Sequence, residues 1–175
     1  ELVEFDDALV VLGGFGEPLR HPKFDEVLGT LHDAGVYGLT VRTAGVDLTD
    51  ERIETLLDHG VDVLTVMLDA WSPDLYGQLQ SPRDPARASL EAVRRRMERV
   101  EECKRSRGLA TPIVVPEFTK SKLNLAEMEA FHDGWLRRLG TSCITGFSDF
   151  GGALTELSVM NMAPPKRVPC RRIQS

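Results

Sequence analysis

Short apolar runs alternate with amphipathic helical patterns along this chain, and the alternation limits the folds that it can adopt. The apolar runs predict strands over residues 9–12, 37–43, 61–68, 112–118 and 143–147. The helical patterns lie between them, over residues 22–34, 49–60, 86–107 and 123–139, with a short helical turn after residue 73. Strands that alternate with helices form a parallel sheet with right-handed crossovers. We therefore expect an α/β fold, either a doubly wound sheet or part of a (β/α) barrel, which periodicity alone does not distinguish.

The composition of single elements gives further expectations about packing. The run 61–68 is almost wholly apolar and rich in valine, which predicts a strand buried on both faces. The helix over 86–107 carries Cys103 on its apolar stripe, and its many arginines predict a solvated, salt-bridged outer face. For the helix over 123–139 we expect the following side chains to point inward: Leu125, Met128, Phe131, Trp135 and Leu136.

Residues at the carboxyl ends of the predicted strands are the candidates for a functional site. In doubly wound sheets and in (β/α) barrels alike, ligands bind at this end of the strands. The residues there are Gly14 to Pro18, Arg42 to Gly45, Asp69, Glu117 and Ser148 to Gly151.

The first of these strand ends is a glycine turn that carries one carboxylate. Gly13, Gly14 and Gly16 allow backbone angles that other residues resist, and Pro18 keeps Glu17 out of helical geometry. Leu19 stands where a dinucleotide fingerprint needs its third glycine, and the Gly-Lys-Ser/Thr of a P-loop is absent from the sequence. A negative charge in this turn suits a ligand that carries a cation, such as an ammonium group, and not a phosphate.

Composition limits the class of protein. The 175 residues are 42% hydrophobic and 27% charged, which is ordinary for a globular domain. The sequence holds no apolar run of membrane-spanning length, no secretory signal and no nucleic-acid-binding motif, so we expect neither a membrane nor a nucleic-acid partner. Three widely spaced cysteines predict no disulfide framework and a reducing, cytoplasmic location.

Four short motifs, in order, give the chain a resemblance to a known family. Phe15-Gly16-Glu17-Pro18 is similar to a Gly-Gly-Glu-Pro element, and Thr43-Ala44-Gly45 to Thr-Asn-Gly. Leu68-Asp69-Ala70 is similar to Leu-Asp-Gly, and Val168-Pro169-Cys170 to the approach to an auxiliary-cluster domain. Together these motifs resemble the radical SAM enzymes that carry a C-terminal SPASM or related auxiliary-cluster domain. The resemblance implies a partial (β/α)₆, TIM-like barrel over residues 1–152, and a linker or arm over 153–175 that leads toward a SPASM-like domain.

The resemblance also implies a reaction and its cofactors. Enzymes of this family use a 4Fe-4S cluster to cleave S-adenosylmethionine to a 5′-deoxyadenosyl radical, here for the modification of a peptide or small metabolite. The electron would come from a donor such as flavodoxin or ferredoxin. The cluster-binding CxxxCxxC is absent from these residues, and we expect it just before Glu1. Cys170 would be a ligand of an auxiliary iron-sulfur cluster; the alternative is a lone thiol in a basic tail.

Individual site residues follow from the resemblance and from their positions. The resemblance implies that Phe15, Gly16, Glu17, Thr43 and Asp69 bind S-adenosylmethionine. Two residues depart from the family pattern, because Ala44 lacks an amide and Met67 lacks a hydroxyl.

Arg42 and Glu117, at two strand ends, are candidates for binding substrate, with Arg42 suited to a carboxylate or phosphate. Alternatively, Arg42 points outward and pairs with a surface acid, and Asp69 caps the following turn.

Two other functions remain open. The first is a degenerate, non-catalytic barrel that binds a nucleoside-like ligand or a protein partner. The second is a non-radical α/β enzyme in which Glu17 and Asp69 act as an acid/base pair.

Overall fold

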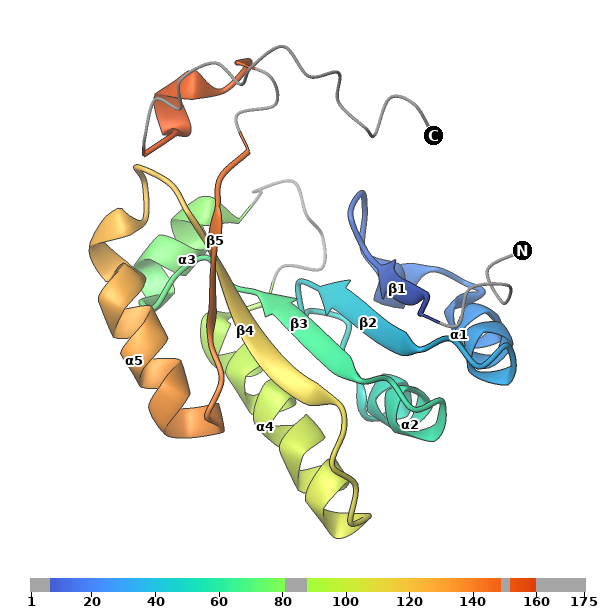
Figure 1. The fold of residues 1–175 in the computed structure, drawn as a ribbon. Coiled ribbons are helices and arrows are strands. Elements are labelled where there is room, and N and C mark those ends of the chain that lie inside the picture. Colours follow the sequence, from blue (N-terminus) through green and yellow to red (C-terminus); the bar gives the residue numbers. More distant parts are fainter. Residues whose placement is uncertain (1–6, 81–87, 149–151, 160–175) are drawn as a thin grey trace.

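The computed structural model describes residues 7–80, 88–148 and 152–159, and a five-stranded parallel sheet lies at its centre. The strands are β1 (Leu9–Leu12), β2 (Gly38–Thr43), β3 (Val63–Met67), β4 (Ile113–Lys120) and β5 (Cys143–Gly146). Their order in the sheet is their order in the chain, and the sheet curls with helices on its outer side (Figure 1). A doubly wound sheet reverses its strand order at a switch point, and this sheet does not. The fold is therefore half of a (β/α) barrel.

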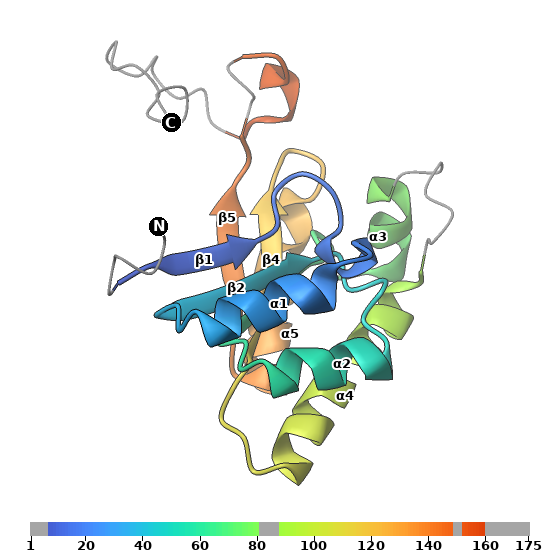
Figure 2. The same ribbon diagram turned by 90° about the vertical axis from the view of Figure 1, so that its right-hand side faces the viewer.

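The crossovers are amphipathic helices with clear start and stop signals. They are α1 (Phe24–Asp33), α2 (Asp50–Asp58), α3 (Pro73–Leu79), α4 (Leu90–Ser106) and α5 (Met128–Leu139), with short 3₁₀ turns η2 (Pro18–Arg20), η3 (Leu125–Glu127) and η4 (Thr155–Leu157). Thr49, Ser72 and Ser89 cap α2, α3 and α4 by accepting a backbone N–H three residues on. In the side view, α1 crosses in front of β2, and α2 lies below α1, next to α4 (Figure 2).

The strands bury one face and leave the other partly open. In β3, Leu64 and Val66 are fully buried against the helices, whereas Val63, Thr65 and Met67 are half-buried. The expectation that this strand is buried on both faces is wrong. Successive side chains of a strand point to opposite faces, and here only the convex face is covered by helices.

Helix α5 also departs from its predicted packing. The segment 123–139 begins with η3, and the α-helix starts only at Met128. Phe131 and Trp135, four residues apart, take the fully buried face, while Leu125 is 40% exposed and Leu136 is 42% exposed. The tighter 3₁₀ turn changes the direction of Leu125, and Leu136 follows Trp135 by one position, about 100° around the helix.

Helix α4 has the predicted apolar stripe. Val93, Met97 and Val100 are fully buried, and Cys103 is buried beside them. The segment 81–87, which includes the start of the predicted helix, lies outside the described residues, as does 160–175, most of the predicted linker.

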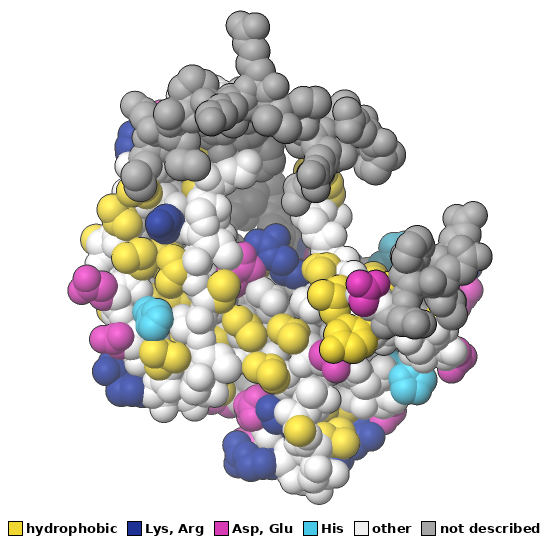
Figure 3. All heavy atoms as spheres, viewed as in Figure 1, with side chains coloured by type: hydrophobic (Ala, Val, Ile, Leu, Met, Phe, Trp, Pro, Cys, Tyr) yellow, Lys and Arg dark blue, Asp and Glu magenta, His cyan; other side chains and the backbone are white. Residues whose placement is uncertain are grey.

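The concave face changes character along the strands. Before the carboxyl ends it is mostly apolar, since Val11, Thr40, Val63 and Ile113 form one lateral row across four strands, in which three of the four side chains are apolar and Val11 is 60% exposed. We call this row the apolar floor. At the carboxyl ends the face carries charged and hydroxyl side chains. Figure 3 looks onto this face and shows hydrophobic side chains across its centre, with a basic and an acidic side chain meeting above them.

Candidate functional site at the carboxyl ends of the strands

The glycine turn after β1 presents a carboxylate in a fixed position. Gly14 and Gly16 adopt φ values of 113° and 88°, which are left-handed conformations that favour glycine. Glu17 is extended, with φ of −106°, and caps the 3₁₀ turn η2 by accepting the Leu19 N–H at 3.2 Å. The extended Glu17 confirms the prediction that Pro18 keeps it out of helical geometry, and Pro18 itself begins the turn.

The end of β2 holds the same carboxylate from the other side. The Thr43 hydroxyl donates to Glu17 Oε1 at 2.6 Å, and the Ala44 N–H donates to Oε2 at 2.8 Å. Thr43 is fully buried, and its hydroxyl accepts the Gly45 N–H at 3.0 Å. Ala44 contributes its backbone, so the missing amide side chain does not affect this bond. Because Oε2 receives one donor from the described residues, it retains an acceptor position for a ligand.

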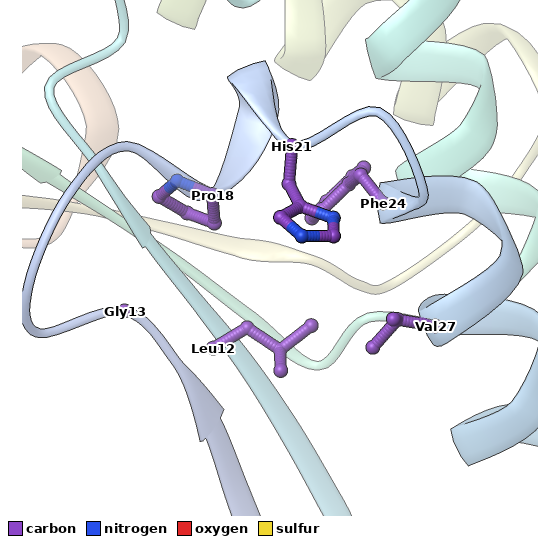
Figure 4. Close-up of a pocket in the computed structure, with 6 residues that line it drawn as sticks. All are labelled: Leu12, Gly13, Pro18, His21, Phe24 and Val27. Atoms are coloured by element: carbon purple, nitrogen blue, oxygen red, sulfur yellow. The ribbon is translucent and has the colours of Figure 1, made fainter.

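Two cavities flank the turn. One, of about 380 Å³, is lined by Phe15, Gly16 and Glu17, with Phe15 fully exposed. The other, of about 210 Å³, lies behind the turn, where Leu12 and Val27 face the rings of Pro18 and His21 (Figure 4). His21 Nδ1 accepts the Lys23 N–H at 3.2 Å. The second cavity is bordered almost entirely by carbon atoms, so the first is the better candidate for a polar ligand.

Asp69 follows β3 in an unusual backbone conformation. Its φ is 57°, the only positive value of a non-glycine residue in the described chain. Its Oδ1 accepts the Thr119 N–H at 2.6 Å. Burial raises the pKa of the Asp69 carboxyl, although the bond from Thr119 opposes the shift.

A small cavity connects the ends of β2 and β3 to helix α3. It has a volume of about 130 Å³ and is lined by Ala44, Met67, Asp69, Tyr76 and Gln80, among others. Gln80 Oε1 is buried and has no hydrogen-bond partner among the residues that the structure describes. With Asp69, it leaves hydrogen-bond acceptors at this end of the site.

Arg42 and Glu117 bind each other across the concave face. Arg42 Nε and Nη2 donate to the two carboxylate oxygens of Glu117 at 2.8 and 2.9 Å, and the Thr145 hydroxyl donates to Glu117 Oε1 at 3.1 Å. The Glu117 side chain is only 6% exposed, so the alternative in which Arg42 points outward to a surface acid is wrong. The bond to Glu117 raises the pKa of Arg42. Arg42 Nη1 has no bonding partner within the described ranges, and the side chain is 32% exposed.

Residues 149–151 and Cys170 lie outside the described residues, so the ligand role of Cys170 stays a prediction.

Several residues that support the site were not found from the sequence. The Glu127 carboxylate accepts the Trp71 and Ser72 N–H groups at 2.7 and 3.0 Å, and also the Ser72 hydroxyl. Burial raises the pKa of Glu127, but the bonds from Ser72 and Trp71 and the charge of Arg94 outweigh burial and lower it. Asn124, which bonds the Asp69 carbonyl, was not found either.

Arg94 corrects the prediction of a fully solvated basic face. It is 6% exposed, lies 4.6 Å from the centre of the Trp71 ring and donates to the Trp71 carbonyl at 2.6 Å. Arg99 and Arg107 of the same helix do form the predicted surface ion pairs. One buried arginine within a basic run gives no signal in the sequence.

Comparison with known proteins identifies the family. The pattern of the radical SAM superfamily matches residues 1–128. The chain belongs to the radical SAM superfamily. This radical SAM chain is 27% identical over 138 residues to a probable GTP 3′,8-cyclase of Methanococcus maripaludis, covering 79% of the chain and 42% of that protein. It is 34% identical over 61 residues to a tungsten-containing aldehyde ferredoxin oxidoreductase cofactor-modifying protein of Pyrococcus furiosus, covering 35% of the chain and 17% of that protein.

A third relative covers most of the chain. An uncharacterized protein of Treponema pallidum is 23% identical over 172 residues, covering 93% of the chain and 46% of that protein. The radical SAM chain thus spans less than half the length of each of these relatives.

Members of the superfamily in general bind S-adenosylmethionine and a 4Fe-4S cluster. Two acceptor groups fit S-adenosylmethionine, which carries an ammonium group, an adenine amino group and a cationic sulfur. They are Glu17 Oε2, in the turn after β1, and Gln80 Oε1, just after α3. For the cluster, the described part of the chain contains no group of three or more His, Cys, Asp or Glu side chains placed to hold a metal. None of its helices has the length and apolarity needed to cross a membrane.

Proposed function

We propose that this chain forms the S-adenosylmethionine-binding part of a radical enzyme that modifies a peptide or small metabolite. One observation carries the proposal: the Glu17 carboxylate is fixed by three donors from η2 and the end of β2, and it keeps an open acceptor position. A carboxylate held in this way needs no rearrangement to receive an ammonium group. Charge-assisted hydrogen bonds of this kind are roughly twice as strong as hydrogen bonds between neutral groups.

Each cofactor residue has a part in this proposal. Glu17 accepts the methionine ammonium, the Gly16 backbone and Phe15 border the same cavity, and Thr43 holds Glu17. Asp69 accepts from the nucleoside end at the cavity after β3. When bound with the cluster, S-adenosylmethionine supplies a carbon radical that abstracts hydrogen from a substrate, and the chain positions the reactants and excludes water.

For the substrate, we propose Arg42 and Glu117 as contacts. Arg42 Nη1 is available to a carboxylate or phosphate, while Glu117 fixes the guanidinium plane. One relative is named as a GTP cyclase, and another as a protein that modifies the cofactor of a tungsten-containing oxidoreductase.

The remaining parts of the proposal concern the whole protein. They are a SPASM-like domain with an auxiliary cluster bound through Cys170, an electron donor such as flavodoxin or ferredoxin, and a cytoplasmic location.

The test is cleavage of S-adenosylmethionine by the intact, anaerobically reconstituted protein, with dithionite as reductant and 5′-deoxyadenosine as the measured product. Glu17→Gln should weaken S-adenosylmethionine binding at least tenfold, because loss of a charge-assisted bond costs about 1.5–3 kcal/mol. The matched control is Glu26→Gln on the exposed face of α1, which should bind like the wild type. Binding without cleavage would favour the non-catalytic barrel, and no binding at all would refute the proposal.

A further inference from the structure

We infer that Asn124 is a positioning residue for Asp69: its side chain fixes the Asp69 backbone so that the carboxylate is held at the mouth of the half-barrel. Asn124 lies before η3, 55 residues away in the sequence, and is 2% exposed. The inference rests on the proposed function only in naming S-adenosylmethionine as the ligand that Asp69 serves.

Asn124 connects the ends of β3 and β4 through a single amide. Its Nδ2 donates to the Asp69 carbonyl at 2.9 Å and to the Thr119 carbonyl at 3.0 Å. Its Oδ1 accepts the Ser121 N–H at 2.7 Å and the Ser121 hydroxyl at 3.1 Å. Both amide hydrogens and both oxygen lone pairs are therefore used, which makes the orientation of this side chain unambiguous.

Asp69 needs such support because of its backbone. A non-glycine residue with φ of 57° pays a conformational cost, and strained residues of this kind persist only where their surroundings fix them. The Asp69 N–H donates to the Glu117 carbonyl at 3.4 Å, and Oδ1 accepts the Thr119 N–H at 2.6 Å. Within the described ranges, Asn124 is the one side chain that bonds the Asp69 carbonyl.

Other side chains hold the loop after Asp69, and their hydrogen bonds do not replace the contact that Asn124 makes. Glu127 accepts the Trp71 and Ser72 N–H groups, and Arg94 donates to the Trp71 carbonyl. These bonds fix residues two and three positions further on. None of these bonds is made to the Asp69 carbonyl, which Asn124 binds.

The Asp69 carboxylate borders the cavity in which a ligand would lie. Oδ1 accepts the Thr119 N–H, and Asp69 lines the cavity together with Tyr76 and Gln80. Loss of the Asn124 amide should let the backbone leave the left-handed region, and the carboxylate should then move out of its half-buried position.

The experiment is a double-mutant cycle on S-adenosylmethionine binding by the intact protein. Asn124→Ala should weaken binding about tenfold, but less than twofold in the Asp69→Asn background, where the carboxylate is already absent. Ser121→Ala is the matched control, since it removes one Asn124 contact without touching Asp69, and it should leave binding within twofold of the wild type. Equal effects of Asn124→Ala in both backgrounds would overturn the inference.

A second readout separates this inference from the proposed function. The pKa of the Asp69 carboxyl, followed by carbon NMR, should fall toward the ordinary aspartate value in Asn124→Ala and stay unchanged in Ser121→Ala. Glu117 and Arg42, whose charges also act on Asp69, are kept in every variant. An unchanged pKa in Asn124→Ala would refute the positioning role even if S-adenosylmethionine binds, whereas a wild type that binds no S-adenosylmethionine refutes the proposed function alone.

If Asn124→Ala does not fold, Asn124→Ser replaces it, because serine can still accept from Ser121 but is too short to reach Asp69.

Discussion

At the scale of single residues, Asp69 combines two costs in one position. Its backbone is left-handed, and burial disfavours its charged form. Residues that cost stability are commonly retained where function needs them, at strained and destabilised active sites. A substitution that removes the Asp69 charge should therefore raise the stability of the protein and weaken ligand binding.

We predict that Asp69→Asn stabilises the protein by about 1 kcal/mol near pH 8. The amide oxygen can still accept from Thr119, and asparagine tolerates a positive φ, but the half-buried charge is gone. Because the folded-state pKa of Asp69 is raised, its favourable contribution is complete below the unfolded pKa and is lost as pH rises through the folded pKa.

The stability advantage of the variant should accordingly grow from pH 4 to pH 8, as measured by urea unfolding at each pH. S-adenosylmethionine binding should fall at the same time. A variant that is less stable than the wild type throughout this range would contradict the prediction.

At the scale of elements, the end of β2 and the glycine turn form one unit through Thr43. Thr43→Val keeps the shape of the side chain but removes the donor to Glu17 and the acceptor of the Gly45 N–H. We expect a loss of about 1–2 kcal/mol in the free energy of unfolding, because two buried bonds are broken.

Thr40→Val is the control, since Thr40 lies on the same strand and its hydroxyl forms no hydrogen bond with the described part of the chain. Chemical denaturation compares the two variants. Equal stabilities would show that the Thr43 hydroxyl does not hold the turn.

The second element-level prediction concerns the contact between α5 and the β3–α3 loop. A Cβ added to Gly134 would lie 2.2 Å from the Trp71 ring, which leaves no room for a methyl group. Gly134→Ala should destabilise the protein by about 1–3 kcal/mol, despite the better helix propensity of alanine.

Gly29→Ala is the same exchange within α1, where the nearest atom would be 3.4 Å away at the end of the His59 side chain. It should be neutral or stabilising by up to about 1 kcal/mol. Thermal unfolding of both variants tests this difference. A Gly29→Ala variant that is destabilised while Gly134→Ala is not would contradict the prediction.

At the scale of the whole molecule, the Arg42–Glu117 pair links β2 to β4 across β3. Arg42→Met should cost about 2–3 kcal/mol, because it leaves a nearly buried carboxylate without its partner. The double substitution Arg42→Met, Glu117→Met should recover most of this loss, since both charges are then removed. Urea unfolding measures the three proteins, and a double variant that is less stable than the single one would contradict the argument.

The sequence predicted much of this architecture because most of it depends on local patterns. The order of strands and helices, the apolar stripe of α4 and the positions of Glu17 and Asp69 beyond the ends of β1 and β3 all follow from periodicity and turn residues. Glu117 was expected at the end of its strand but lies within β4, which continues to Lys120. The pairing of Arg42 with Glu117 does not follow from local patterns, because the two residues are 75 positions apart and their meeting depends on register across three strands.

Asn124 and Arg94 escaped prediction for a similar reason. The burial of each polar side chain depends on elements distant in the sequence. These are the ends of β3 and β4 for Asn124, and Trp71 for Arg94. The half-open face of β3 was also missed, because a valine-rich run looks the same whether one or both faces are covered.

The curl of the sheet also determines which surfaces can reach the apolar floor. A row of exposed valine and isoleucine on a flat sheet would stack against the flat face of another molecule. Here the row lies on the concave side of a curled sheet (Figure 1). A flat face of another molecule cannot follow this curvature, so the curl of the sheet protects the row from stacking of that kind.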